Sequence, residues 1–135
     1  MAVFSLPKRV YIEDTDAGGI VYYVNYLKYM ERARTELMRS LGHGKAAIFN
    51  ANLMFVVAET QIKYLQPAKL DDELAVSAEV IASTGATLLF EQRVSRGDEL
   101  LCAGNVKIAC VDRNSLKPRR IPAEMLPQLR RTNGE

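Results

Sequence analysis

The stretch EDTDAGGIVYYVNYLKYMERAR, from Glu13 to Arg34, decides the fold and raises the question of function. Its first half places three carboxylates and two glycines close together, and its second half begins a helix. From Asn25 to Leu41 the apolar residues recur at intervals of three and four positions, the periodicity of a helix with one buried face. We therefore predict one long amphipathic helix that follows an acidic, glycine-containing loop.

The ends of this helix carry residues that are typical of helix termini. Asn25 is the predicted N-cap, and either Gly42 or Gly44 is the predicted stop. Charged residues on the polar face are spaced to pair along the helix, Lys28 with Glu31 and Arg32 with Glu36.

The rest of the chain alternates in the manner of β-strands. A short strand interrupted by Pro7 is expected over Phe4–Ile12, and the HGKAAIFNAN segment after the helix is expected to form a helical turn or two. Four further strands joined by short loops are predicted over Phe55–Leu65, Leu74–Val80, Leu88–Val94 and Leu100–Cys110. One strand, one helix and then four strands favour an α+β fold, in which the helix lies across one face of an antiparallel sheet.

Composition bounds the class of protein. At 135 residues the chain is expected to form a single domain over residues 1–135, with a basic, proline-containing tail from about residue 113. The net charge of +2 is too small to indicate nucleic-acid binding, and no apolar run approaches the ~20 residues of a membrane span. The N-terminus lacks the pattern of a signal peptide. Cys102 and Cys110 are too far apart in one predicted strand to pair within it, so we expect reduced, buried thiols and a cytoplasmic location.

The acidic loop and the helix start together suit acyl transfer. A helix N-terminus has unpaired backbone N–H groups and partial positive charge, which can stabilise an oxyanion. Gly18 and Gly19 allow the backbone to approach a ligand closely. A carboxylate a few residues upstream could attack a carbonyl or activate water. The same residue types are common in loops and helix caps, so the motif alone leaves a purely structural role open.

A family resemblance extends over nearly the whole chain. The segment RVYIEDTDAGGIVYYVNYLKYMERARTELMRSLG, together with VVAETQIKYLQPAKLDDEL and CVDRNSLKPRRIP, resembles the 4-hydroxybenzoyl-CoA thioesterase-like hotdog proteins. Within them it is most similar to the bacterial acyl-CoA thioesterases associated with the Tol–Pal gene cluster. The pattern Asp-x-Asp-x-x-Gly-x-Val-Tyr, followed by Tyr26 and Glu-Arg-Ala-Arg, carries the resemblance.

This resemblance implies a fold, an activity and an assembly. The expected fold is a curved antiparallel sheet around one long central helix, and the expected assembly is a homodimer or homotetramer with active sites at the subunit boundary. The activity implied is hydrolysis of an acyl-CoA thioester, with Asp16 as the catalytic carboxylate. The backbone N–H of Tyr23, at the helix start, is expected to polarise the thioester carbonyl. The remaining residues implied to line the substrate site are Gly18, Gly19, Val24 and Asn25.

The resemblance also separates catalytic from structural acids. Asp14 matches the first aspartate of the pattern, and a structural role is expected for it and for Glu13. Many Tol–Pal-associated members carry histidine where this chain has Tyr23. A thiolate leaving group, with a pKa of about 8–9, needs little help from an acid, so Asp16 and a helix-end oxyanion site could suffice.

The sequence gives weaker support to other catalytic residues and other kinds of site. Glu31 is an alternative catalytic carboxylate, because another hotdog subfamily carries its acid on the central helix. His43 is the only histidine, so no metal site is expected. The glycines form no familiar phosphate-binding loop, and no cofactor is expected. No Gly-x-Ser-x-Gly motif indicates a serine hydrolase, and no histidine is placed to activate Cys102 or Cys110.

The basic tail leaves two interpretations open. Arg119 and Arg120, within KPRRIP, could contact the phosphates of coenzyme A, or they could lie on a solvated surface. Two rival functions also remain. The chain could be a non-catalytic acyl-CoA or acyl-carrier binding module, a possibility raised by Tyr23, or a protein that recruits partners through its tail.

Overall fold

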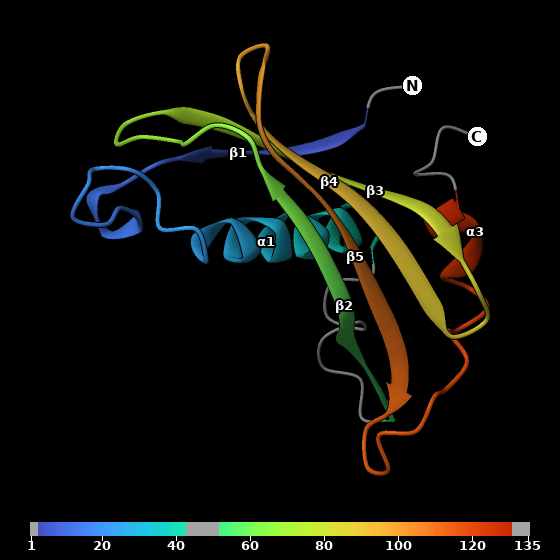
Figure 1. Cartoon of the computed structure of the whole chain (residues 1–135). Helices are drawn as coiled ribbons and strands as arrows, with labels where there is room; N and C mark the ends of the chain where they lie inside the picture. The colour runs from blue at the N-terminus through green and yellow to red at the C-terminus, as the bar shows by residue number, and fades with distance from the viewer. Residues whose placement is uncertain (1–2, 43–51, 131–135) are drawn as a thin grey trace.

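The computed structural model describes residues 3–42 and 52–130, which form one sheet and two α-helices (Figure 1). A 3-10 turn, η1, covers Ile12–Asp14. The helices and strands are β1 (Phe4–Arg9), α1 (Asn25–Ser40), β2 (Leu53–Tyr64), β3 (Glu73–Ser83), β4 (Thr87–Arg96), β5 (Glu99–Asp112) and α3 (Leu126–Arg130). No helix among these residues is long and apolar enough to cross a membrane. The helical turns predicted after Gly42 fall on residues 43–51, outside the described ranges.

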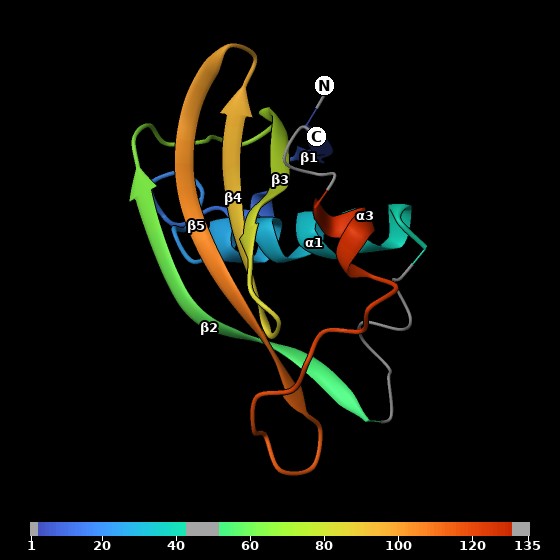
Figure 2. The ribbon, with the colours of Figure 1, turned by 90° about the vertical axis from the view of Figure 1, so that its right-hand side faces the viewer.

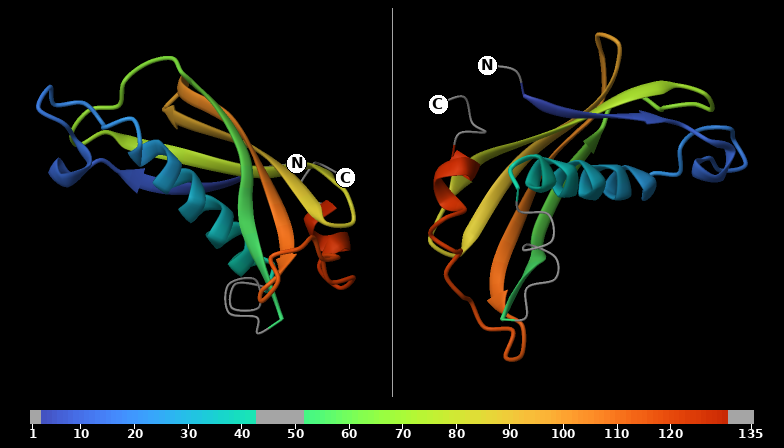
Figure 3. Two further views of the ribbon diagram at one scale, coloured as in Figure 1. Left: turned by 60° about the horizontal axis from the view of Figure 1, so that its bottom comes forward. Right: turned by 180° about the vertical axis from the view of Figure 1, so that it is seen from behind.

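The sheet is antiparallel throughout, with strand order β1-β3-β4-β5-β2. It curves around α1, which crosses its concave face (Figures 2 and 3). The two edge strands are therefore β1 and β2. Pro7 has no backbone N–H to donate, and its place on edge strand β1 is one that proline tolerates. The predicted α+β architecture is confirmed.

Alternating side chains of the inner strands form the core against α1. The inward positions of β3, Leu74, Val76, Ala78 and Val80, are almost completely buried. On the helix, the residues that pack against them are Tyr26, Tyr29, Met30, Ala33 and Leu37. Four of these are apolar positions that the helical periodicity marked, and Tyr29 is an addition. The fifth marked position, Leu41, is only partly buried.

Irregular pairing shifts some side chains from the face that strict alternation predicts. Strand β5 changes register between Leu100 and Cys102, opposite Ser95 and Val94 of β4. As a result Leu101 is completely buried and Leu100 is only half-buried, whereas strict alternation from Cys102 would bury Leu100 and expose Leu101.

The ends of β1 and α1 differ in detail from the prediction. Strand β1 stops at Arg9, and η1 replaces its predicted last residues. Asn25 is the first residue inside α1 and not its N-cap; Val24 occupies that position. Gly42 follows the helix with a φ of +86°, which confirms it as a stop signal.

The predicted ion pairs along α1 do not form. In the described part of the chain, the ion pair of this helix joins Arg39 to Glu36, at 3.1 Å. Neither Lys28 and Glu31 nor Arg32 and Glu36 approach within pairing distance.

The C-terminal segment is more than a basic tail. Beyond β5 the chain turns back, and the N–H of Ile121 donates to the carbonyl of Gly85 in the β3–β4 turn, at 2.8 Å. Ile121, Met125 and Leu129 are buried in the core, so this segment closes the end of the sheet that lies away from the acidic loop (Figure 1).

Candidate active site

The acidic loop is a small hairpin at the N-terminal end of α1. The N–H of Tyr22 donates to the carbonyl of Asp14 at 3.0 Å, and the N–H of Asp16 donates to the carbonyl of Ile20 at 2.9 Å. The turn closes with a hydrogen bond from Gly19 N–H to the Asp16 carbonyl at 3.0 Å. Gly19 has a φ of +79°, a conformation that glycine adopts without strain. The hairpin therefore presents Asp16 at its tip.

Asp14 is the residue that anchors this hairpin. Its side chain is buried, with 8% of the residue exposed. The Oδ2 atom accepts a hydrogen bond from the N–H of Tyr11 at 2.9 Å and lies 3.6 Å from the Nζ of Lys8. The carbonyl of Asp14 also accepts a hydrogen bond from the Nδ2 of Asn25, at 2.8 Å, which ties the loop to the first turn of α1. These contacts are structural, as the resemblance implied.

Asp16, in contrast, is exposed. Its Oδ1 atom accepts a hydrogen bond from the N–H of Gly18 at 2.8 Å, and a Cβ added at Gly18 would lie 3.3 Å from that oxygen. The second carboxylate oxygen has no partner among the described residues. Half of this carboxylate is thus held by the loop, and the other half is free to contact a ligand or water.

The start of α1 provides unpaired backbone donors. Among the described residues, the N–H groups of Tyr23 and Val24 have no acceptor. They precede a helix of 16 residues, at the end where its partial positive charge is concentrated. An oxygen that gains negative charge during a reaction is stabilised at such a position.

Tyrosine side chains surround this helix start. The Tyr23 ring lies 5.1 Å from that of Tyr22 and 6.0 Å from that of Tyr64. The hydroxyl of Tyr64 donates to the carbonyl of Tyr23 at 3.4 Å, and the hydroxyl of Tyr26 accepts the N–H of Ala68 at 3.0 Å. Burial raises the pKa of both Tyr26 and Tyr64, so these phenols are neutral hydrogen-bonding groups at pH 7. Tyr22, Tyr23 and Tyr64 remain about half exposed and form an apolar rim.

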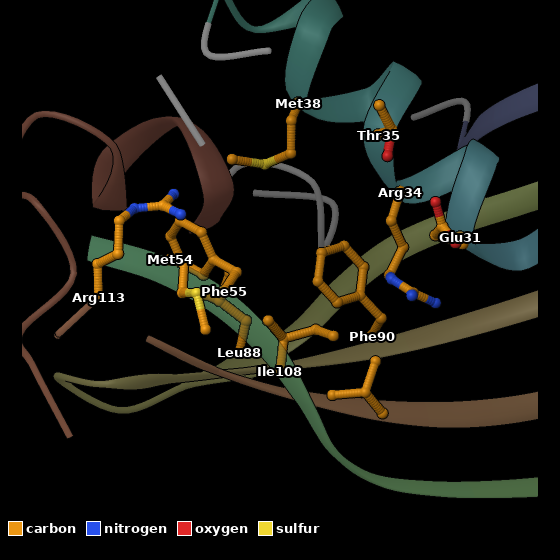
Figure 4. A pocket seen from close by; sticks show the side chains of 11 residues that line it. Glu31, Arg34, Thr35, Met38, Met54, Phe55, Leu88, Phe90, Ile108 and Arg113 are labelled. Carbon is orange, nitrogen blue, oxygen red and sulfur yellow. The ribbon is translucent and has the colours of Figure 1, made fainter. Parts of the chain in front are cut away.

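A groove leads away from the helix start between α1 and the sheet. It has a volume of about 240 Å³, begins at Val24 and Leu27, and runs past Glu31 and Arg34. The last two residues also line a cavity of about 440 Å³, whose walls include Met38, Phe55, Phe90 and Ile108 (Figure 4). Asp16 lines neither hollow, so a single copy of the chain places this carboxylate beside open solvent.

The tail arginines lie far from Asp16 within one chain. Arg119 pairs with Asp112 at 3.5 Å and donates to the carbonyl of Asn52 at 2.9 Å, where β2 begins. Arg120 is exposed beside Gly85. Since the acidic hairpin is bridged at Ile20 to Lys69, beyond the other end of β2, the two groups lie at opposite ends of the sheet (Figure 1).

The remaining candidate residues from the sequence are the two cysteines, Glu31 and His43. Cys102 is completely buried, and burial raises the pKa of its thiol to about 11, which fits the predicted inert thiol. Cys110 is also a free, buried thiol. Glu31 is exposed in the wall of the groove and the cavity. His43 is outside the described residues.

Two residues of this region were not found from the sequence. Arg34 donates from Nη1 to the Oε1 of Gln92 at 2.9 Å, and Gln92 is 0% exposed at the centre of β4. The signal was present, because Gln92 occupies an inward position between Phe90 and Val94 in an otherwise apolar alternation.

A curved antiparallel sheet around one long helix is the hotdog fold, and this chain carries an acidic hairpin at the N-terminus of the helix. Comparison with known proteins gives the same result. Residues 10–129 match the family model of the thioesterase-like superfamily. The acyl-CoA thioesterase YbgC of Haemophilus influenzae is 49% identical over 90% of each chain. The acyl-CoA thioester hydrolase YbgC of an Escherichia coli strain is 38% identical over 95% of this chain and 96% of its own.

Solved structures agree with this assignment. The crystal structure of a probable thioesterase from Bartonella henselae is 34% identical, with a TM-score of 0.80, over 90% of this chain and 98% of its own. The chain belongs to the thioesterase-like superfamily.

Proposed function

We propose that this protein hydrolyses acyl-CoA thioesters, with Asp16 as the general base or nucleophile and the backbone N–H of Tyr23 as the oxyanion donor. The observation that carries the proposal is the pairing of a half-free carboxylate, on a hairpin tied to α1 by Asp14 and Asn25, with unpaired N–H groups at the start of that helix. The activity named for relatives up to 49% identical supports it.

The proposed reaction consumes one water and releases a carboxylic acid and the thiol of coenzyme A. Asp16 either removes a proton from the attacking water or attacks the carbonyl itself, after which water hydrolyses the mixed anhydride. The carbonyl oxygen gains negative charge in both routes, and the N–H of Tyr23 stabilises it. The sulfur departs as a thiolate of low basicity, so the absence of histidine at position 23 does not remove an essential acid. Gly18, Gly19 and Val24 complete the substrate contacts in this proposal, while Asn25 acts through its bond to Asp14.

The proposed active unit contains two copies of the chain. Strand β2 is an edge strand, and Glu59, Gln61 and Lys63 on it are exposed. Antiparallel pairing of two β2 strands centred on Gln61 would set Glu59 of each copy opposite Lys63 of the other, which gives a self-complementary interface.

This pairing would also complete the site. Continued beyond the strand, the same register sets Leu53 of one copy opposite Lys69 of the other, and Lys69 bridges to Ile20 in the acidic hairpin. Arg119, which donates to Asn52, would then lie near the partner's hairpin and could contact the phosphates of coenzyme A, with Arg120 close by. A cytoplasmic location and a role beside the Tol–Pal proteins belong to this proposal, and both rest on the resemblance.

Hydrolysis of a panel of acyl-CoA thioesters tests the reaction. Asp16→Asn should lower kcat/KM by roughly a hundredfold or more, the usual contribution of a general base or nucleophile. Glu13→Gln is the matched control, because Glu13 is an exposed acid of the same loop and its variant should keep the wild-type rate. Equal rates for Asp16→Asn and wild type would eliminate the mechanism. Tight binding of acyl-CoA without turnover of any chain length would favour the binding module instead.

A further inference from the structure

Arg34 is a cation in the wall of the groove that forms no ion pair with a carboxylate of the described residues. Its side chain extends from α1 toward β4 and lies beside Phe90 (Figure 4). Among the described residues its one hydrogen bond is to Gln92, and no Asp or Glu oxygen lies within 4.0 Å of it. Burial lowers the pKa of the guanidinium, and Glu31 counteracts this only in part.

Gln92 fixes the position of this guanidinium. The Nε2 atom of Gln92 donates to the carbonyl of Met30 at 2.9 Å and to the carbonyl of Ser77 at 3.1 Å. Because both N–H bonds of the amide are used, its oxygen must face Arg34. A guanidinium has five N–H donors, so most of those of Arg34 stay available to a ligand.

The surroundings favour an anionic ligand. Val57 and Val106 line the groove beside Arg34, and Phe90 lines the cavity. A cation in apolar surroundings is costly unless it is paired, and a carboxylate matches the planar guanidinium with two parallel hydrogen bonds. A carboxylate that binds here would therefore compensate the charge of Arg34 and accept two parallel hydrogen bonds from its guanidinium.

The place of Arg34 along the groove sets the length of the ligand. Arg34 follows Tyr23, the proposed oxyanion donor, by eleven positions, or about 16 Å at the rise of a helix, and long helical side chains lean back toward the N-terminus. The guanidinium is thus on the order of 10 Å from the proposed oxyanion position. An extended acyl chain of roughly six to ten carbons spans that length.

We infer that the groove binds an acyl group that ends in a carboxylate, held by Arg34, so that the preferred substrate is the coenzyme A monothioester of a medium-chain α,ω-dicarboxylic acid. This inference rests on the proposed function for its reaction, while the anion site itself rests on Arg34 and Gln92. Arg34 is the specificity-determining residue, and the apolar groove wall contacts the methylene chain.

Glu31 opposes this ligand. It lines the same groove and is exposed, and its carboxylate forms no ion pair with a described residue. Its negative charge weakens the attraction of Arg34 for a second carboxylate. Glu31→Gln should therefore increase the preference for the carboxylate-ended substrate by a fewfold.

The test compares two thioesters of equal chain length, octanoyl-CoA and the mono-CoA thioester of octanedioic acid. Wild type should have a kcat/KM at least tenfold higher for the second. Arg34→Met should bring the ratio of the two close to one. Arg34→Lys, which keeps the charge and the fold of the site but loses the planar fork, should give an intermediate ratio. Arg32→Met removes an exposed arginine of the same helix and should keep the wild-type ratio.

Binding of free octanedioate, followed by calorimetry, separates this inference from the proposed function. Binding that Arg34→Lys weakens tenfold, in a protein that hydrolyses no thioester, would uphold the anion site and reject the hydrolase. Faster hydrolysis of octanoyl-CoA than of its carboxylate-ended partner by wild type would reject the inference and leave the hydrolase standing. Unfolding temperatures of the variants show that each compared protein is folded.

Discussion

Two aspartates separated by one residue have different environments because Asp14 ends the 3-10 turn η1, whereas Asp16 begins the tight turn of the hairpin. Asp14 lies inside, where the N–H of Tyr11 and the Nζ of Lys8 meet its carboxylate. Asp16 lies at the tip, where, in the described part of the chain, its carboxylate is bound by the N–H of Gly18 alone. The 3-10 turn η1 ends at Asp14 and directs its side chain inward, whereas the tight turn that follows Asp16 leaves the second carboxylate at the exposed tip.

Gly104 lies in the core, at a position where one added carbon atom would meet the neighbouring strand. A Cβ at this position would lie 2.9 Å from the carbonyl oxygen of Gln61 and 3.0 Å from Cγ1 of Ile62, with Cε of Met30 at 3.5 Å. We expect Gly104→Ala to lower the free energy of unfolding by about 1–3 kcal/mol, because β2 must move, whereas the distance to Met30 is an ordinary van der Waals contact. Urea unfolding checks this, with Ala103→Gly on the outer face as a control for the loss or gain of one methyl group. A Gly104→Ala protein as stable as wild type would show that β2 is free to shift.

At the scale of elements, Arg96 clamps two loops together beneath the acidic hairpin. It donates to Oδ2 of Asp72 and to Oε1 of Glu99, each at 2.5 Å, and so joins the β4–β5 hairpin to the loop before β3. Asp72 also accepts the N–H of Lys69 at 2.8 Å, and Lys69 bridges to Ile20. The clamp thus supports the position of the hairpin.

This clamp predicts a pH dependence of stability. Partial burial alone would raise the pKa of Asp72, but the N–H of Lys69 and the guanidinium of Arg96 outweigh it and hold the pKa below its ordinary value. A lowered pKa gives stability that is complete above the unfolded value of about 3.9 and is lost as pH falls through the folded value. Asp72→Asn should lower the unfolding temperature by about 2–5 °C at pH 7, and the difference from wild type should shrink as the pH falls below about 3.9 and through the folded pKa. A difference that is constant with pH would show that charge is not its cause.

Local patterns predicted the elements well, and tertiary contacts explain the failures. The helix from Asn25 and the five strands follow from periodicity, which each segment carries within itself. The N-cap assignment of Asn25 was wrong because the carbonyl of Asp14, distant in sequence, takes its amide. The hydrogen bond between Arg34 and Gln92 was not predicted, because it depends on how α1 lies across β4. No single segment of the sequence determines that arrangement.

At the scale of the whole molecule, one copy of the chain holds only part of the proposed site. Asp16 and the N–H of Tyr23, unpaired among the described residues, lie at one end of the sheet, and the arginines proposed to contact coenzyme A lie at the other. In an antiparallel pair of β2 strands, the hairpin end of one copy would lie beside the opposite end of the other. Each acidic hairpin would then meet the partner's basic segment. This arrangement would also cover the edge of β2, which otherwise exposes unpaired backbone groups.

The proposed register makes a prediction about charge. Glu59→Lys sets lysine opposite Lys63 twice in each symmetric dimer, and Lys63→Glu sets glutamate opposite Glu59 twice, so each single variant should weaken dimerisation roughly tenfold or more. The double variant Glu59→Lys/Lys63→Glu restores opposite charges and should recover most of the wild-type dissociation constant, as measured by sedimentation equilibrium. Asp98→Lys, in the exposed β4–β5 turn, controls for the change in net charge. Recovery in the double variant should return acyl-CoA hydrolysis as well, because the two-copy site depends on the pairing. Single variants that dimerise as tightly as wild type would place the interface elsewhere.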